Sequence, residues 1–188
     1  MRVSQEEMDS HHLRIVEGAS RLIRKQGIET TSVNDVMSQA GLTHGGFYRH
    51  FDSKEALVSA ALEEAFNDAI KVIEDSYSDL GPKEGAERYY EHYLSQGHVK
   101  HPELGCPISA LSMDVARSTP VVKATFSDGF KRAVDKLAEA GNGSPVENRL
   151  AAIRRLSMLA GAVMIARASD ADTARSVLAA CGESGEQM

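Results

Sequence analysis

The sequence has few cysteines and no long apolar run, and each absence excludes a class of protein. Its 188 residues include two cysteines, Cys106 and Cys181, too few for a disulfide framework and without the clustered spacing of a structural zinc site. No apolar stretch approaches the roughly 18 to 20 residues that a membrane span needs, and the first ten residues are polar. We therefore expect a cytoplasmic protein with reduced thiols and no membrane partner.

Patterns that carry enzymatic chemistry are also missing. The chain has no Gly-rich phosphate-binding loop, no Ser/His/Asp set in a recognisable context and no paired carboxylates on a shared helix face. We predict that the protein is not an enzyme and that it uses no catalytic residue, no metal and no other cofactor.

The net charge of −6 opposes nucleic-acid binding, but this charge is unevenly distributed along the chain. Residues 1–54 carry seven Lys/Arg and seven Asp/Glu, which leaves fourteen Lys/Arg and twenty Asp/Glu in the remainder. The acidic excess thus lies beyond residue 54. A neutral N-terminal segment, which also holds four histidines, can bind DNA through local contacts.

Apolar residues recur at helical spacing almost throughout, so the sequence predicts an all-α protein of about nine helices. We expect an N-terminal helix-turn-helix DNA-binding domain of three helices over residues 1–54. A larger helical domain for effector binding and dimerisation should occupy residues 55–188, joined to the first by a long helix that ends near residue 78. Further helices are predicted over residues 83–97, 107–117, 120–140, 146–168 and 172–180, with an irregular stretch at 98–105 and a disordered tail at 182–188.

Polar residues indicate where the short N-terminal helices begin. Ser32 and Asp35 have the spacing of a capping box, and Thr43 can cap a third short helix. The long fourth helix can be capped by Asp52 with Glu55 or by Ser53 alone.

The most informative segment, residues 32–57, contains two short predicted helices joined by a glycine-containing turn, as in a helix-turn-helix. Gly45 and Gly46 lie inside the second of them, where each costs about 1 kcal/mol relative to alanine. A backbone that must approach another surface closely explains such a cost, and here that surface would be the major groove of DNA. Phe47 and Phe51, four residues apart, should anchor the helix from its other side.

Residues 40–57 resemble the signature of the TetR family of transcription regulators, AGLT-x-G-x-x-Y-x-H-F-x-S-K-E-x-L. The resemblance covers about residues 10–60; the remainder is similar to the family only in length and helical content. It implies backbone contacts to DNA from Thr43, Tyr48, His50 and Lys54, and base contacts near His44. The resemblance and the hydrogen-bond donors around the motif together give the predicted DNA-binding residues. They are Ser32, Thr43, His44, Gly45, Gly46, Tyr48, Arg49, His50 and Lys54.

One three-helix unit contacts few bases, so we expect a homodimer that binds a palindromic operator in double-stranded DNA. The resemblance implies that the last two helices pair with those of a second copy. It also implies a repressor that a small-molecule inducer releases from DNA, although activators exist in the family. The predicted dimer interface contains Leu150, Ile153, Leu156, Leu159, Val163, Met164, Val177 and Leu178.

Aromatic, Met and Cys residues at helical spacing could line a cavity for an effector, although such a stripe more often forms core. The predicted effector-binding residues are Tyr89, Tyr93, Cys106, Met113, Phe126, Phe130 and Met158.

Cys106 supports an alternative, a thiol-based sensor of oxidants or electrophiles with the same fold. Gly105 and Pro107 flank it at a predicted helix start, and helix N-termini lower thiol pKa values. A second alternative is a transition-metal site made by His98, His101 and Cys106. A small helical enzyme using Cys106, and an interaction module that binds no DNA, are the remaining alternatives.

Overall fold

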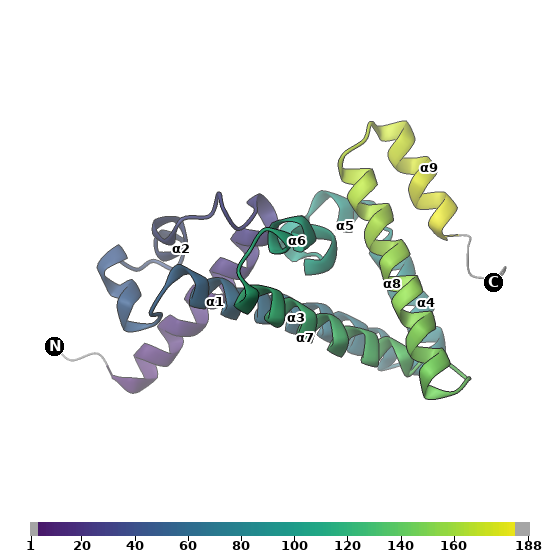
Figure 1. Ribbon diagram of the computed structural model, residues 1–188, viewed down its shortest axis with the longest axis horizontal. Coiled ribbons are helices and arrows are strands. Elements are labelled where there is room, and N and C mark those ends of the chain that lie inside the picture. The colour runs from purple at the N-terminus through teal and green to yellow at the C-terminus, as the bar shows by residue number, and fades with distance from the viewer. Residues whose placement is uncertain (1–3, 183–188) are drawn as a thin grey trace.

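The computed structural model describes residues 4–182, and within this range the chain forms nine α-helices, two 3₁₀ helices and no strand (Figure 1). The all-α prediction is therefore confirmed. The elements are α1 Gln5–Gln26, α2 Val33–Gln39, η1 His44–Arg49, α3 Lys54–Tyr77, α4 Gly81–Tyr93, α5 Gln96–Lys100, η2 Pro102–Leu104, α6 Pro107–Ala116, α7 Pro120–Ala138, α8 Pro145–Arg167 and α9 Ala171–Gly182.

The first two helices begin and end where local chemistry predicts. Ser4 and Glu7 form a capping box at the start of α1, and Gly27 ends it with a positive φ of 92°. The predicted capping box of Ser32 and Asp35 is present at the start of α2. The two helices pack through buried apolar side chains, among them Ile15 and Val36.

The third element differs from the prediction of a capped α-helix. Residues 44–49 form a 3₁₀ helix, and the Thr43 side chain makes no capping hydrogen bond. Two consecutive glycines weaken an α-helix here, and a six-residue segment between two anchored helices is of the length at which 3₁₀ geometry is common. The long helix α3 follows, and the Ser53 hydroxyl accepts the N–H of Ala56 at 3.0 Å. Of the two caps predicted for it, Ser53 is the one the structure contains.

Residues 81–104 contain more breaks than the sequence indicated. The predicted helix over 83–97 is divided into α4 and α5, because the Ser95 hydroxyl accepts the N–H of His98 and begins a new helix. The predicted irregular stretch 98–105 consequently includes the end of α5 and all of η2. Helices α6 to α9 lie close to their predicted positions. Of the predicted tail, Gly182 belongs to α9, and residues 183–188 lie outside the described residues.

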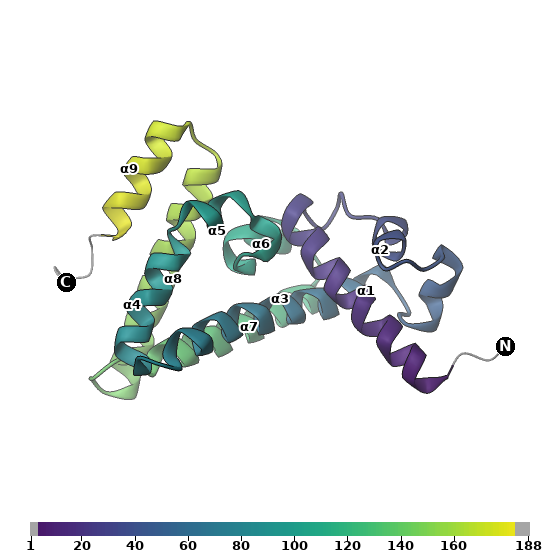
Figure 2. The same ribbon diagram turned by 180° about the vertical axis from the view of Figure 1, so that it is seen from behind.

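The helices after η1 form a triangular body (Figures 1 and 2). Helices α3 and α7 lie side by side along one edge, and α4 and α8 lie along a second. The short helices α5 and α6 close the third edge, next to α1, and α9 folds back on α8. Helix α3 packs against α4 and α7 in this body and also against α1. It therefore connects the body to the N-terminal unit, which consists of α1, α2 and η1. Across residues 4–182, no helix has both the length and the apolar character that crossing a membrane requires.

The close approach of α3 and α7 depends on Gly129. A Cβ at this position would lie 2.2 Å from a ring carbon of Phe66, which is fully buried and contacts Phe126 edge to face. Only a residue without a side chain lets the Phe66 ring occupy this position.

We predict that Gly129→Ala lowers the free energy of unfolding by about 1 to 3 kcal/mol, the usual cost of overpacking a core. Alanine's better helix propensity offsets part of that cost. Urea denaturation followed by circular dichroism measures the change. Gly97→Ala is the matched control, since the nearest atom to its added Cβ is the Ser95 hydroxyl oxygen at 3.6 Å. Equal stability of the two variants would contradict the packing described for Phe66.

Candidate nucleic-acid interface

The reading segment, residues 43–50, is held against α1 and α2 by two aromatic side chains. Phe47 and Phe51 are 2% and 7% exposed, and their rings stack with centroids 5.8 Å apart. Met37 of α2 is fully buried beside them, and His12 of α1 stacks on Phe51 at 4.8 Å. The predicted anchoring role of the two phenylalanines is thus met by their positions in the core.

The other side of the reading segment is open. Tyr48 is 72% exposed, and Thr43, His44 and Arg49 are exposed as well. A Cβ added at Gly45 would meet no atom within 4 Å. Nothing within the described chain therefore requires a glycine at this position, and the space beside it is open.

Two other predicted contact residues, Ser32 and Lys54, have intramolecular partners, whereas Gly46 only lies near α2. A Cβ on Gly46 would lie 3.6 Å from the Met37 methyl carbon, an ordinary contact. The Ser32 hydroxyl is occupied by the cap of α2, where it donates to the Asp35 carboxylate at 2.6 Å and lowers the pKa of that carboxyl. The Lys54 ammonium lies 3.4 Å from the carbonyl oxygen of Glu29, which places it beside the start of α2.

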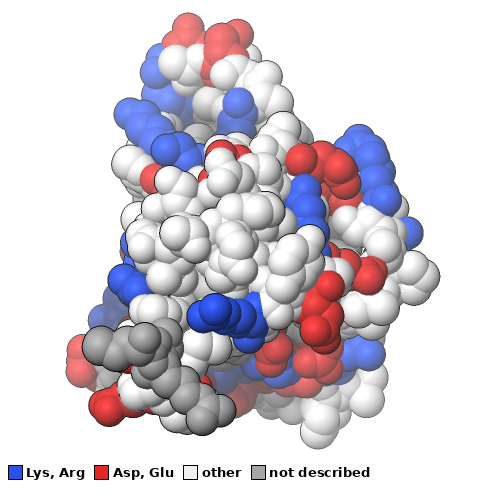
Figure 3. Space-filling view, turned by 90° about the vertical axis from the view of Figure 1, so that its left-hand side faces the viewer, with Lys and Arg blue, Asp and Glu red and all other residues white. Residues whose placement is uncertain are grey.

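The face that carries the reading segment has little formal charge at its centre. Figure 3 views the molecule from this end: uncharged residues fill the middle, Lys and Arg lie around them, and acidic side chains gather on one side. Contacts at the centre would have to come from hydroxyl, imidazole and backbone groups, which bind phosphates and base edges by hydrogen bonding.

In the body, the predicted effector residues separate into three groups. Tyr89, Tyr93 and Cys106 are buried and line a cavity of about 20 Å³, room for about one water molecule. Phe126, Phe130 and Met158 are partly buried and do not line it. Met113 is 55% exposed, which corrects its assignment to a cavity. Its neighbours Leu111 and Val115 fill the inward face of α6 instead.

Cys106 is in an environment opposite to that of a reactive thiol. Its side chain is buried, and burial raises the pKa of the thiol above its ordinary value, outweighing the hydrogen bonds at the helix start. The structure therefore does not favour the sensor alternative. Tyr93 is a neighbour of Cys106, and its buried hydroxyl makes no well-formed hydrogen bond.

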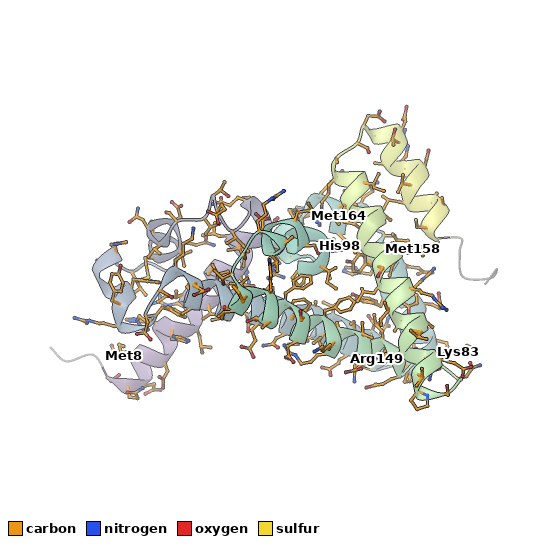
Figure 4. The ribbon with its side chains drawn as sticks, in the orientation of Figure 1. Met8, Lys83, His98, Arg149, Met158 and Met164 are labelled. Atoms are coloured by element: carbon orange, nitrogen blue, oxygen red, sulfur yellow. The ribbon has the colours of Figure 1, made fainter. Side chains whose placement is uncertain are left out.

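The metal alternative is wrong because His98 has no free ring nitrogen. Its Nε2 accepts the backbone N–H of Cys106 at 3.0 Å, and its Nδ1 donates to the carbonyl of Tyr93 at 2.6 Å. Burial lowers the pKa of His98 to about 4, so the ring is neutral at pH 7, as this bonding requires. His101 lies on the surface beside Glu103, and no group of three metal-binding side chains exists among residues 4–182. Figure 4 shows His98 inside the body, near α6.

A buried arginine, Arg24, and a half-buried one, Arg167, bind the chain around His98, and sequence analysis predicted neither role. Arg24 of α1 is 3% exposed; its guanidinium donates to the carbonyl of Gly105 at 3.0 Å and pairs with Asp68 of α3 at 2.7 Å. Arg167 of α8 donates to the carbonyl of His98 at 2.8 Å from the opposite side. The only sequence signal was an arginine at the end of each predicted helix, which usually marks a solvated last turn.

Only some of the predicted dimer residues on α8 and α9 are exposed enough to contact a second copy of the chain. Leu156, Leu159, Val163 and Leu178 are buried within the single chain, so they form its core and cannot contact a second copy. This corrects half of the predicted set. Leu150 is 46% exposed, and Ile153, Met164 and Val177 are partly exposed. Ile165, which the sequence analysis did not select, is 50% exposed on α8.

Comparison with known proteins places the N-terminal segment in a described family. Residues 15–61 match the family model of bacterial regulatory proteins, tetR family. The chain is 35% identical over 80 residues to YerO of Bacillus subtilis, an uncharacterized HTH-type transcriptional regulator, and that alignment covers 41% of this chain and 28% of YerO. In three curated relatives the aligned segment spans 28%, 37% and 40% of the relative's length.

Similarity outside this segment is weaker but extends over most of the chain. Rv0196 of Mycobacterium tuberculosis, also named an uncharacterized HTH-type transcriptional regulator, is 27% identical over 165 residues, 82% of each chain. The crystal structure of a TetR transcriptional regulator from Chloroflexus aurantiacus superposes with a TM-score of 0.76, covers 95% of each chain and is 21% identical. At that identity the likeness shows a shared fold.

We predict that Cys106 reacts with a thiol-specific probe at least about tenfold more slowly than Cys181 in the native protein, because burial restricts access and disfavours the thiolate. Cys181 is partly exposed on α9. Mass spectrometry of Cys106→Ser and Cys181→Ser measures the two rates separately, and labelling in denaturant should make them similar. Fast labelling of native Cys181→Ser would show an accessible Cys106 and revive the sensor hypothesis.

Proposed function

From the premise that this chain belongs to the tetR family of bacterial regulatory proteins, we propose that it regulates transcription by binding operator DNA as a homodimer. The open side of the reading segment carries this proposal: Gly45 meets no atom of its own chain, while Tyr48 and its neighbours project outward. Insertion into a major groove requires a segment that is anchored to the core on one side and carries hydrogen-bond donors on its open side. The family is one of regulators and not a class of enzymes.

We assign residues 1–54 to DNA binding and residues 55–188 to effector binding and dimerisation. The proposed boundary falls at the first turn of α3. Because α3 continues without a break into the body, a conformational change in the body can rotate α3 and with it the reading segment.

The DNA contacts we propose are those of the exposed reading segment and its flanks. Tyr48 and Lys54 would bind backbone phosphates, and the segment near His44 and Gly45 would approach base edges. A dimer would present two such segments to half-sites one helical turn, about 34 Å, apart or a multiple of it. The remaining proposed contacts are Ser32, Thr43, Gly46, Arg49 and His50.

We further propose a repressor released by a small-molecule effector, a role typical of the family. The cavity beside Tyr93 and Cys106 has room for about one water molecule, so an effector there would have to widen it. Widening would displace residues 104–106, whose Gly105 carbonyl binds Arg24 of α1. Effector binding and the position of the N-terminal unit would then be coupled through this hydrogen bond.

The sharpest test replaces the exposed Tyr48 and the half-buried Lys54, and circular dichroism checks that both variants fold. Tyr48→Ala and Lys54→Ala should each weaken binding about tenfold, since each removes one phosphate contact. Binding is measured by fluorescence anisotropy on duplexes recovered by selection from genomic DNA. Lys123→Ala on the exposed face of α7 is the matched control and should bind like the wild type. Wild-type affinity in both folded variants would show that this face does not bind DNA.

Failure to recover any duplex with the wild-type chain would instead favour an interaction module that binds no DNA. In that case the variants are uninformative, and the proposed function is wrong.

We predict that Leu150→Glu shifts the chain from dimer to monomer, because it places a charge on the exposed apolar part of α8. Sedimentation over a range of concentrations measures the dimer dissociation constant, which should rise at least about tenfold. Val121→Glu, at a 56% exposed site on α7, is the control and should leave dimerisation unchanged. A wild-type dissociation constant for Leu150→Glu would place the interface elsewhere.

A further inference from the structure

Three histidines from two parts of the sequence meet on the N-terminal unit. His11 and His12 lie on α1, and His50 is the last residue of the reading segment. The His50 ring centroid lies 6.3 Å from that of His11 and 6.0 Å from that of His12. All three side chains are partly exposed. We call these residues the histidine cluster.

Fixed contacts on one side hold the cluster at the edge of the reading segment. The His12 ring stacks on Phe51, whose own ring packs on Phe47 in the core. Figure 1 shows the first half of α1 and the segment at residues 44–50 at the same end of the molecule. The cluster therefore cannot move independently of the residues proposed to contact DNA.

The electrostatic surroundings disfavour protonation of His50 when no DNA is bound. Partial burial lowers the pKa of His50, and the positive charges of His12, His11 and Arg49 lower it further. Among the acidic groups near in sequence, Asp9 of α1 accepts a hydrogen bond from the Gln5 side chain, and Asp52 is exposed to solvent. A positive charge on His11 or His12 therefore opposes protonation of His50.

We propose that His11, His12 and His50 form a proton-linked phosphate-binding site that takes up protons when the chain binds DNA. This rests on the proposed function, since the phosphates are those of the bound duplex. A phosphate beside the cluster favours the imidazolium forms, which donate hydrogen bonds and displace counterions as Lys and Arg do. Binding and protonation then stabilise each other, so lower pH strengthens binding.

The direction and size of the effect follow from linkage. An unperturbed imidazole changes charge at about pH 6.5, so the range from about pH 8 to 6 is the one in which a phosphate-linked proton would be taken up. Between about pH 8 and 6 the bound form holds more protons than the free form, and each extra proton raises affinity tenfold per unit fall in pH. For a homodimer with one site per chain, we expect affinity to rise at least about tenfold over this range.

The test measures binding at pH 6, 7 and 8 at constant ionic strength. The probe is a duplex of about 30 base pairs with the sequence most often recovered in the genomic selection. The wild type should gain affinity about tenfold or more toward pH 6, and His11→Gln/His12→Gln less than about threefold. His101→Gln, which removes an exposed histidine of the body, is the matched control and should keep the full dependence. His44→Gln shows what a histidine of the reading segment outside the cluster contributes.

A second measurement does not depend on the variants folding. Calorimetric titration of the wild type with the same duplex at pH 7, in two buffers of different ionisation enthalpy, gives the protons taken up on binding. We expect at least about half a proton per dimer, the average uptake that a tenfold gain in affinity over two pH units requires. Zero uptake, or an unchanged pH dependence in a folded double variant, overturns the histidine cluster while leaving DNA binding intact. Absence of binding at every pH overturns the proposed function itself.

Discussion

The buried guanidinium of Arg24 is the contact on which the relation between the N-terminal unit and the body depends. It leaves α1, pairs with Asp68 of α3 and donates to the carbonyl of Gly105, so one side chain joins three segments far apart in sequence. A charge in this position is stable only while its partners stay in place, because an unpaired buried cation costs several kcal/mol. Any rearrangement at residues 104–106 is therefore transmitted to α1 and not absorbed locally.

Gly105 lies at the centre of this arrangement for a steric reason. A Cβ there would be 2.6 Å from Nε2 of His98, the atom that accepts the N–H of Cys106. The turn, the neutral imidazole and the buried thiol thus exclude any larger residue, and Arg167 fixes the far side through the carbonyl of His98. The cavity beside Tyr93 borders this turn, so its occupant and Arg24 would act on the same short stretch of backbone. In the proposed function, this shared stretch would couple an effector in the cavity to the proposed DNA-binding surface.

The elements that could be predicted from sequence are those governed by neighbours in the chain. The capping box of Ser32 and Asp35 and the Ser53 cap depend on a few consecutive residues, and both were found. Burial on a helix that is apolar on several sides depends on the packing partners: Leu159 faces the core and Ile165 the outside, although both are equally apolar in sequence. Met113 was misplaced for the same reason. Arg24 could not be distinguished from a solvated helix terminus, because Gly105 lies 81 residues away.

The glycines fall into two groups: contacts within the chain require some of them, and no such contact requires others. Gly129 and Gly105 are required by contacts within the chain, at 2.2 and 2.6 Å from an added Cβ. Gly45 costs helix stability and is required by nothing within 4 Å. Under the proposed function, the surface that Gly45 approaches is a groove of the bound duplex, reached from a donor-rich segment that Phe47 anchors to the core.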